Sequence, residues 1–237
     1  MNSDNNFPMP FGATIGNNDI WIQLLNRCQG AGLRPALFLD RDGVIVEDTH
    51  YLHRIDDVSL ITGAAQTISL ANALAIPVVI VTNQSGIGRG IFDWQDFAAV
   101  QERILTDLAD QGAFVNAVLA CPFHADGTRR YRHPDHPCRK PNPGMIHLAV
   151  RMLPIDLSES WIIGDRTSDL AAAQSGGLAG GLHVRSGHGT EPAEQSGVTI
   201  LRSERFDVIQ RKSIADAATC LPLLTASGNP TGGFHDV

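Results

Sequence analysis

Two kinds of apolar pattern alternate along this chain. Short continuous apolar runs are typical of strands buried in a sheet, whereas apolar residues spaced every three or four positions are typical of helices. The runs predict strands over residues 36–39, 76–81, 114–120, 161–164, 182–184 and 206–209. The spaced pattern predicts helices over residues 20–29, 63–74, 94–111, 145–153, 168–175 and 213–224. Strands that alternate with helices in this way indicate an α/β fold with a mostly parallel sheet.

The segments outside this pattern set the expected domain limits. We expect residues 1–34 to form a leader with one short helix, residues 35–226 a single domain, and residues 227–237 a flexible tail. Residues 121–144 lack apolar periodicity and predict a long loop, and long loops in compact domains are usually functional. Residues 186–198 are rich in Gly and Ser, so we expect them to be exposed.

Polar residues follow three of the predicted strands. Asp40, Thr82 and Asp165 each stand where a strand ends, and parallel sheets bind ligands outside the carboxyl ends of their strands. Asp42 lies two residues after Asp40 and shares its face of the chain, and Gly43 lets the backbone turn away. One such carboxylate can attack phosphorus while the other moves the proton. The alternative is an Asp-rich surface turn.

Composition narrows the classes of function. The 237 residues are 43% hydrophobic and 18% charged, which suits a globular core. A net charge of −7 argues against a general nucleic-acid binder, and no apolar stretch is long enough to cross a membrane. Four cysteines in a chain of this length are too few for a disulfide framework, so we expect a reducing, cytoplasmic location.

Four motifs, in order, resemble those of the haloacid dehalogenase (HAD) superfamily of phosphatases. They are Asp40-Arg41-Asp42-Gly43, Val81-Thr82-Asn83-Gln84, Arg139-Lys140-Pro141 and Gly164-Asp165-Arg166-Thr167-Ser168-Asp169. Within the superfamily, the longer motifs at residues 39–45, 81–90 and 138–145 resemble the heptose bisphosphate phosphatase and histidinol-phosphatase group. The resemblance covers about residues 35–226 and implies a Rossmann-like sheet flanked by helices. The chain has no large insertion that could form a separate cap domain.

The resemblance also implies catalytic roles. Asp40 would attack phosphorus to form an aspartyl-phosphate, and Asp42 would protonate the leaving oxygen and then activate water. A magnesium ion would be held by the Asp40 carboxylate, the Asp42 backbone carbonyl and Asp165. Lys140 would steady Asp40 and the phosphoryl group, whose oxygens Thr82 would bind.

The remaining site residues concern substrate choice. Contacts with the substrate are expected from Asn83, Ser85, Arg89 and Arg139. Arg89 and Arg139 suit a second anionic group, because guanidinium binds phosphate with two hydrogen bonds, although ordinary surface arginines are the alternative. Residues 47–57 follow the nucleophile strand and could form a wall of the pocket. Asp169 either orients Lys140 or occupies the first turn of a helix, where negative charge is favourable.

The 121–138 loop raises the question of a second metal. Tetrahedral zinc prefers sulfur and nitrogen ligands, and the expected set is Cys121, His124, His136 and Cys138, with His133 as a spare. Relatives with a zinc loop usually show Cys-x-His and Cys-x-Cys, whereas this chain has Phe123 and His136 at two of those positions. Unligated loop residues are therefore the alternative.

These observations predict a magnesium-dependent phosphatase of carbohydrate metabolism that acts on a small phosphorylated sugar or metabolite, as a cytoplasmic monomer. The resemblance favours removal of the 7-phosphate of D-glycero-D-manno-heptose 1,7-bisphosphate. The alternatives are hydrolysis of histidinol phosphate or another small metabolite, and a non-catalytic phosphate-binding module. A kinase is excluded because the chain lacks a Gly-x-x-x-x-Gly-Lys-Ser/Thr loop.

Overall fold

A single eight-stranded sheet organises the computed structural model, which describes residues 9–16, 18–28 and 32–225. Across the sheet the strands run β1 (Ala13–Ile15), β2 (Trp21–Leu24), β5 (Ala117–Cys121), β4 (Val78–Asn83), β3 (Leu37–Leu39), β6 (Trp161–Gly164), β7 (Gly180–Val184) and β8 (Asp207–Arg211). The strands from β5 to β8 are parallel to one another, and β2 and β1 add an antiparallel hairpin at the β5 edge. The mostly parallel α/β sheet expected from the sequence is confirmed.

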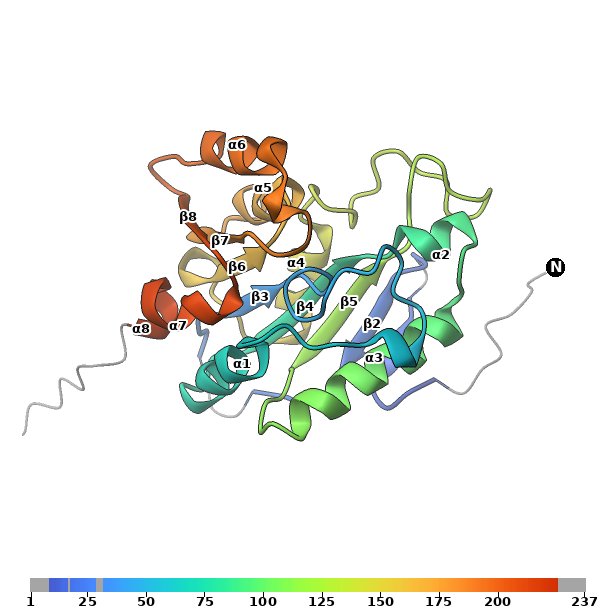
Figure 1. Ribbon diagram of the computed structural model, residues 1–237, viewed down its shortest axis with the longest axis horizontal. Coiled ribbons are helices and arrows are strands. Elements are labelled where there is room, and N and C mark those ends of the chain that lie inside the picture. The colour runs from blue at the N-terminus through green and yellow to red at the C-terminus, as the bar shows by residue number, and fades with distance from the viewer. Residues whose placement is uncertain (1–8, 17, 29–31, 226–237) are drawn as a thin grey trace, which may run out of the picture.

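The helices cover both faces of the sheet. They are α1 (Ala64–Ala73), α2 (Ser85–Arg89), α3 (Trp94–Ala109), α4 (Gly144–Met152), α5 (Thr167–Gly176), α6 (Pro192–Ile200), α7 (Ala217–Cys220) and α8 (Pro222–Thr225). Helices α1 and α3 pack on one face, and α4 and α5 pack on the other (Figure 1). Asp93 caps α3, because its side chain accepts hydrogen bonds from the backbone N–H groups of Gln95 and Asp96.

The central strand β3 is completely apolar. Strand β3 is buried along its whole length, and Phe38 pairs with Val79 on one side and Ile162 on the other. A strand surrounded in this way places the residue that follows it, Asp40, at the middle of the carboxyl edge. No insertion within the described ranges is large enough for a separate cap domain, and none of the helices described there is long and apolar enough to span a bilayer.

The predicted helix over residues 20–29 is wrong. Residues 21–24 form β2, in which Trp21 and Gln23 are buried while Ile22 and Leu24 are partly exposed, and residue 29 lies outside the described residues. This period of two fits a strand, and an apolar run this short can be read either way. Strand β1 also falls inside the expected leader, so the sheet begins before residue 35. The predicted tail, 227–237, lies outside the described residues, as do residues 1–8 of the leader.

Three smaller differences concern helices. Residues 85–89 form the short helix α2, and the Gly-rich stretch 186–198 contains a 3-10 turn (Gly187–Thr190) and part of α6. The predicted closing helix over 213–224 is broken into a 3-10 turn (Ile214–Asp216), α7 and α8. The break between α7 and α8 falls at Leu221, whose backbone is extended because a residue that precedes a proline disfavours the helical conformation.

Candidate active site

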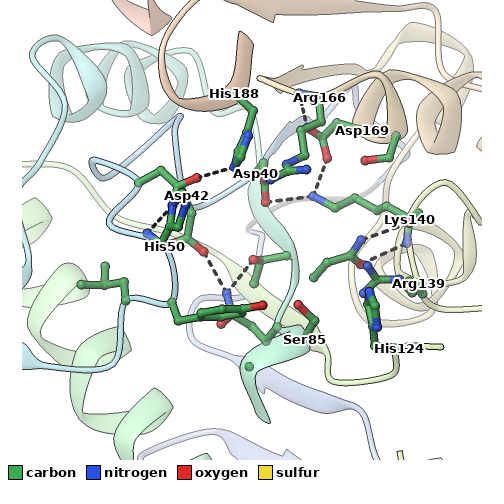
Figure 2. Close-up of a pocket in the computed structure, with 18 of the residues that line it drawn as sticks. Asp40, Asp42, His50, Ser85, His124, Arg139, Lys140, Arg166, Asp169 and His188 are labelled. Carbon is green, nitrogen blue, oxygen red and sulfur yellow. Dashed lines mark hydrogen bonds and ion pairs between the residues drawn. The ribbon is translucent and has the colours of Figure 1, made fainter. Parts of the chain in front are cut away.

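The strand ends converge on one cavity of about 560 Å³ (Figure 2). Its lining includes most of the predicted site residues, namely Asp40, Asp42, Thr82, Asn83, Ser85, Arg89, His124, Arg139 and Lys140. Asp48, His50, Tyr51 and Leu52 also line it, which confirms that the 47–57 segment forms a wall. The cavity is therefore built from the ends of β3 and β4, α2, and the loops after β3 and β5.

Lys140 lies between two carboxylates (Figure 2). Its Nζ atom is 2.8 Å from Asp40 Oδ1 and 2.7 Å from Asp169 Oδ1, and it donates a hydrogen bond of 2.8 Å to the Val81 carbonyl. Burial lowers the pKa of Lys140, but Asp169 and Asp40 outweigh it and raise that pKa above its usual value. Lys140 is therefore a fixed positive charge beside Asp40, and Asp169 orients it.

Asn83 holds the backbone of Lys140. Its side-chain amide donates to the Lys140 carbonyl at 3.0 Å, and its carbonyl oxygen accepts from the Lys140 N–H at 3.1 Å. Both polar ends of the Asn83 side chain are thus used within the protein. This arrangement positions the lysine, a role that the sequence analysis did not assign to Asn83.

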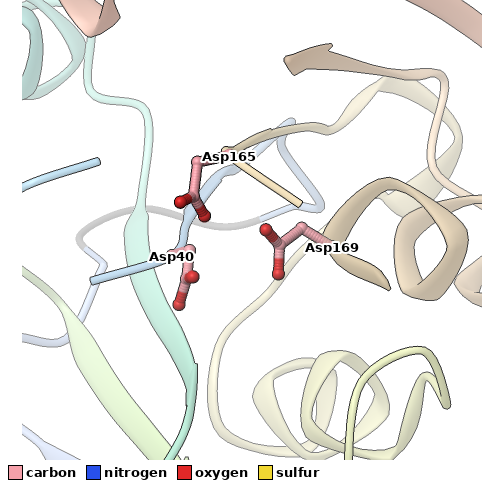
Figure 3. Close-up of side chains that lie close together, drawn as sticks. All are labelled: Asp40, Asp165 and Asp169. Carbon is pink, nitrogen blue, oxygen red and sulfur yellow. The ribbon is translucent and has the colours of Figure 1, made fainter. Parts of the chain in front are cut away.

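Three acidic side chains form the strongest candidate for a metal centre. Oxygen atoms of Asp40, Asp165 and Asp169 lie within 4.8 Å of one another (Figure 3), and the described residues contain no other such group of His, Cys, Asp or Glu. Asp165 Oδ1 is buried without a hydrogen-bond partner, while Oδ2 accepts from the His188 N–H at 2.7 Å. Burial, together with Asp169 and Asp40, raises the pKa of Asp165 to about 9. An unpartnered buried oxygen among hard oxygen donors fits magnesium.

Glycines make room for Asp165. Gly43 has a φ of +78°, and a Cβ atom built there would lie 2.5 Å from Asp165 Oδ2. A Cβ at Gly187 would also collide with this oxygen. The turn after Asp42 therefore requires glycine both for its backbone conformation and for the space beside the carboxylate.

Asp42 has a different set of partners, which the sequence analysis missed. Arg41 Nε donates to Asp42 Oδ1 at 3.1 Å and Arg41 Nη2 to Oδ2 at 3.0 Å. Gln84 Nε2 also donates to Asp42 Oδ2, at 3.0 Å, and contacts Thr82 Oγ1 at 2.9 Å. Burial raises the pKa of Asp42, and the Arg41 guanidinium opposes that rise.

The two predicted anion-binding arginines lie on one side of the cavity. Arg139 Nη1 donates to the Phe123 carbonyl at 2.9 Å, and burial lowers the pKa of Arg139. Arg89 Nη1 donates to the Tyr51 hydroxyl at 2.9 Å, and Arg89 Nη2 lies 3.3 Å from Asp126 Oδ2. Arg166 and Ser168 also line the cavity, so this side is rich in positive charge.

His188 was not singled out from the sequence. Its Nε2 lies 3.0 Å from Asp48 Oδ2, and its Nδ1 lies 2.6 Å from Glu191 Oε1. Because its backbone N–H also reaches Asp165, it joins the 47–57 wall to the acidic centre. No motif marks it, since it comes from the Gly-rich stretch after β7.

The predicted zinc ligands are not gathered into one site in the part of the chain that the structure describes. Cys121 Sγ is 4.0 Å from His136 Nδ1, which already accepts a hydrogen bond from the Cys138 N–H. His124 instead contacts Arg89 at 3.2 Å. Phe123 stacks on His136 with ring centroids 3.8 Å apart, and burial raises the pKa of Cys121 to about 12. Among the described residues, no three of the four expected ligands lie close enough together to share one ion.

Comparison with known proteins places this arrangement in a class. A family model described as HAD-hydrolase-like matches residues 137–205, which contain Lys140, Asp165 and Asp169. A crystal structure of a HAD-like protein from Mesorhizobium loti is 40% identical, with a TM-score of 0.68, and the match covers 78% of this chain and 96% of that one. The fold is that of the HAD-like hydrolases, and the relatives matched are phosphatases.

Individual relatives show which family within the HAD-like hydrolases this chain resembles. A D-glycero-β-D-manno-heptose-1,7-bisphosphate 7-phosphatase of Mesorhizobium japonicum is 44% identical over 173 residues, covering 73% of this chain and 80% of the relative. The D,D-heptose 1,7-bisphosphate phosphatase of B. bronchiseptica, solved with magnesium and phosphate, is 31% identical with a TM-score of 0.66 and covers 78% of this chain and 96% of that one. The chain belongs to the heptose-bisphosphate phosphatase family of HAD-like hydrolases.

Proposed function

We propose that this chain is a magnesium-dependent phosphomonoesterase that removes the 7-phosphate of D-glycero-β-D-manno-heptose 1,7-bisphosphate. The observation that best supports this reaction is the buried cluster of Asp40, Lys140 and Asp169 beside Asp165, at the carboxyl end of β3. The 44% identity with the Mesorhizobium japonicum relative supports the substrate.

In the proposed mechanism, Asp40 attacks phosphorus and forms an aspartyl-phosphate, while the leaving oxygen takes a proton from Asp42. Asp42 then removes a proton from the water that hydrolyses the intermediate. Lys140, whose Nζ lies 2.8 Å from Asp40 Oδ1, would also face the phosphoryl oxygens, where charge spreads in the transition state. Thr82 and Ser85, which line the cavity, would donate hydrogen bonds to these oxygens.

Magnesium fits the acidic centre because Asp165 offers an unpartnered buried oxygen. Asp40, Asp165 and the backbone carbonyl of Asp42 would hold the ion. When bound, it would neutralise the phosphate dianion so that a carboxylate can approach it. The proposed residues of the chain supply the nucleophile, the proton and the lysine charge.

Arg139, with Arg89, would bind the phosphate that is not cleaved. Both arginines line the cavity, and both guanidinium groups are already held by the protein, Arg139 by the Phe123 carbonyl and Arg89 by Tyr51. Guanidinium groups ordered in advance bind a phosphate at a lower entropic cost. A bisphosphate therefore suits this cavity better than a monophosphate.

The test is release of phosphate from a panel of substrates. The panel holds both anomers of heptose 1,7-bisphosphate, a sugar monophosphate and histidinol phosphate. We expect the highest kcat/KM on the β-bisphosphate, no turnover after chelation, and none in Asp40→Asn, which keeps the shape of the carboxylate without its nucleophilicity. Near wild-type release by Asp40→Asn would refute the covalent mechanism, and a preference for histidinol phosphate would replace the substrate.

Zinc, a monomeric state and a cytoplasmic location stay predictions. Elemental analysis of protein purified without added metal tests zinc, because one zinc per chain would require the 121–138 loop to rearrange from the geometry described. Size-exclusion chromatography with light scattering tests the monomer. If active protein contains well below one zinc ion per chain, the loop is ordered by ring packing instead, such as that of Phe123 on His136.

A further inference from the structure

The two carboxylates of the Asp-x-Asp motif have separate cationic partners. Asp40 pairs with Lys140, while Asp42 pairs with Arg41, the residue between the two acids. In Figure 2, Lys140 approaches Asp40 from one side and Asp42 lies on the other. Each of the two carboxylates is therefore paired with a positively charged side chain. These two pairs offset the repulsion between Asp40 and Asp42, which lie close together in the sequence.

Arg41 is held firmly. Its side chain is completely buried, and its guanidinium carbon lies 5.2 Å from the centre of the Phe97 ring in α3. A buried guanidinium without a partner is very costly, so this residue needs the two hydrogen bonds to Asp42. The geometry is the two-bond guanidinium–carboxylate pair, which fixes orientation as well as distance.

Gln84, which follows the neighbouring parallel strand β4, completes the arrangement. It is buried, and its amide bridges Asp42 Oδ2 and Thr82 Oγ1 at 3.0 and 2.9 Å. Asp42 is thus tied to the residue proposed to bind the phosphoryl oxygens. A carboxylate held from two directions has few orientations left, and a proton donor within hydrogen-bond reach of the leaving oxygen needs this.

We propose that Arg41, together with Gln84, is a positioning residue that aims the Asp42 carboxyl group at the leaving oxygen. This inference rests on the proposed function, because it takes Asp42 as the proton donor. Arg41 itself is fully buried and is not among the residues that line the cavity, and its guanidinium contacts both Asp42 and the Phe97 ring. Its effect must therefore appear only where the proton from Asp42 matters.

The leaving group separates this role from a merely structural one. A sugar alkoxide leaves only with a proton, whereas p-nitrophenolate leaves as a stable anion and needs little help. The measured quantity is kcat/KM, which reports steps up to the transfer of the phosphoryl group to Asp40. Arg41→Met should lower kcat/KM for the heptose bisphosphate at least tenfold more than for p-nitrophenyl phosphate.

Gln84→Met, which keeps the side-chain length, should also lower kcat/KM more for the heptose bisphosphate than for p-nitrophenyl phosphate, but by a smaller factor than Arg41→Met. Asp42→Asn should show the full difference in kcat/KM loss between the two substrates. Adding Arg41→Met to Asp42→Asn should lower kcat/KM little further, because the two residues act as one unit. Equal losses on both substrates in Arg41→Met and in Gln84→Met would overturn the inference. Should Arg41→Met fail to fold, as judged by circular dichroism, Gln84→Met decides alone. A failure of the proposed function shows separately, as turnover by Asp40→Asn.

Discussion

Asp165 makes the metal-free protein sensitive to pH in an unusual direction. Burial and two neighbouring carboxylates raise its pKa to about 9, whereas an unfolded Asp titrates near 4. Between these values the folded protein binds a proton that the unfolded chain does not. Stability of the metal-free protein should therefore fall as pH rises through this window, and be greatest near its acidic end.

The size of the effect follows from one proton. A fully developed difference of one proton changes the free energy of unfolding by about 1.4 kcal/mol per pH unit, so the span from pH 5.5 to 7.5 gives roughly 2–3 kcal/mol. For a domain of this size that corresponds to a fall in Tm on the order of 5–10 °C. Bound magnesium needs the ionised carboxylate, so saturating magnesium should flatten or reverse the trend.

The assay is thermal unfolding in excess chelator at both pH values, repeated with magnesium. The matched control is Asp165→Asn, which keeps the shape of the side chain but has no proton to lose. Other groups contribute to the pH dependence of both proteins, so the difference between them isolates Asp165. Equal slopes for the wild type and Asp165→Asn would show that this carboxyl group is ionised without metal, and would refute the reasoning.

Three further predictions follow from named contacts. Arg139→Ala should lower kcat/KM for the bisphosphate at least tenfold more than for a sugar monophosphate, while Lys140→Ala should slow both; equal losses from both variants in steady-state assays would mean that the two roles are not divided. Gly43→Ala should destabilise the protein by about 1–3 kcal/mol, because its φ is positive and the new Cβ meets Asp165, whereas Gly32→Ala, also at positive φ but with nothing within 4 Å, should cost less in chemical denaturation. Trp21→Ala should cost about 3–5 kcal/mol, because this fully buried ring stacks on Trp94 at 5.7 Å, and an unchanged unfolding midpoint would argue against that packing.

The catalytic frame could be predicted from the sequence because it depends on local rules. The apolar run before Asp40 and the run before Thr82 predict buried strands, and parallel strand ends must meet at one edge. Lys140 was also accessible, through its motif. The sequence left open whether Asp169 orients Lys140. In the structure, Asp169 Oδ1 lies 2.7 Å from Lys140 Nζ.

The roles of other residues could not be predicted from the sequence, because these roles arise from tertiary packing. Arg41 stands between two acids, where a surface position is the ordinary expectation, and only the ring of Phe97 and the burial of the strand end turn it inward. His188 comes from a Gly-rich stretch with no apolar pattern, although it contacts the pocket wall and the acidic centre. The strand β2 was read as a helix because its partner, β5, lies almost a hundred residues further along the chain.

The hairpin of β1 and β2 bears on how the protein can be shortened. Sequence resemblance alone would suggest starting at residue 35, but that cut would leave β5 as an open edge of unpaired backbone groups, and such edges promote aggregation. It would also remove Asp19, which forms an ion pair with Arg130 at 2.6 Å, and Trp21, whose neighbour Trp94 donates a hydrogen bond to Tyr131. The first strands therefore brace the loop that leads to Arg139, and expression tags belong ahead of them rather than in their place.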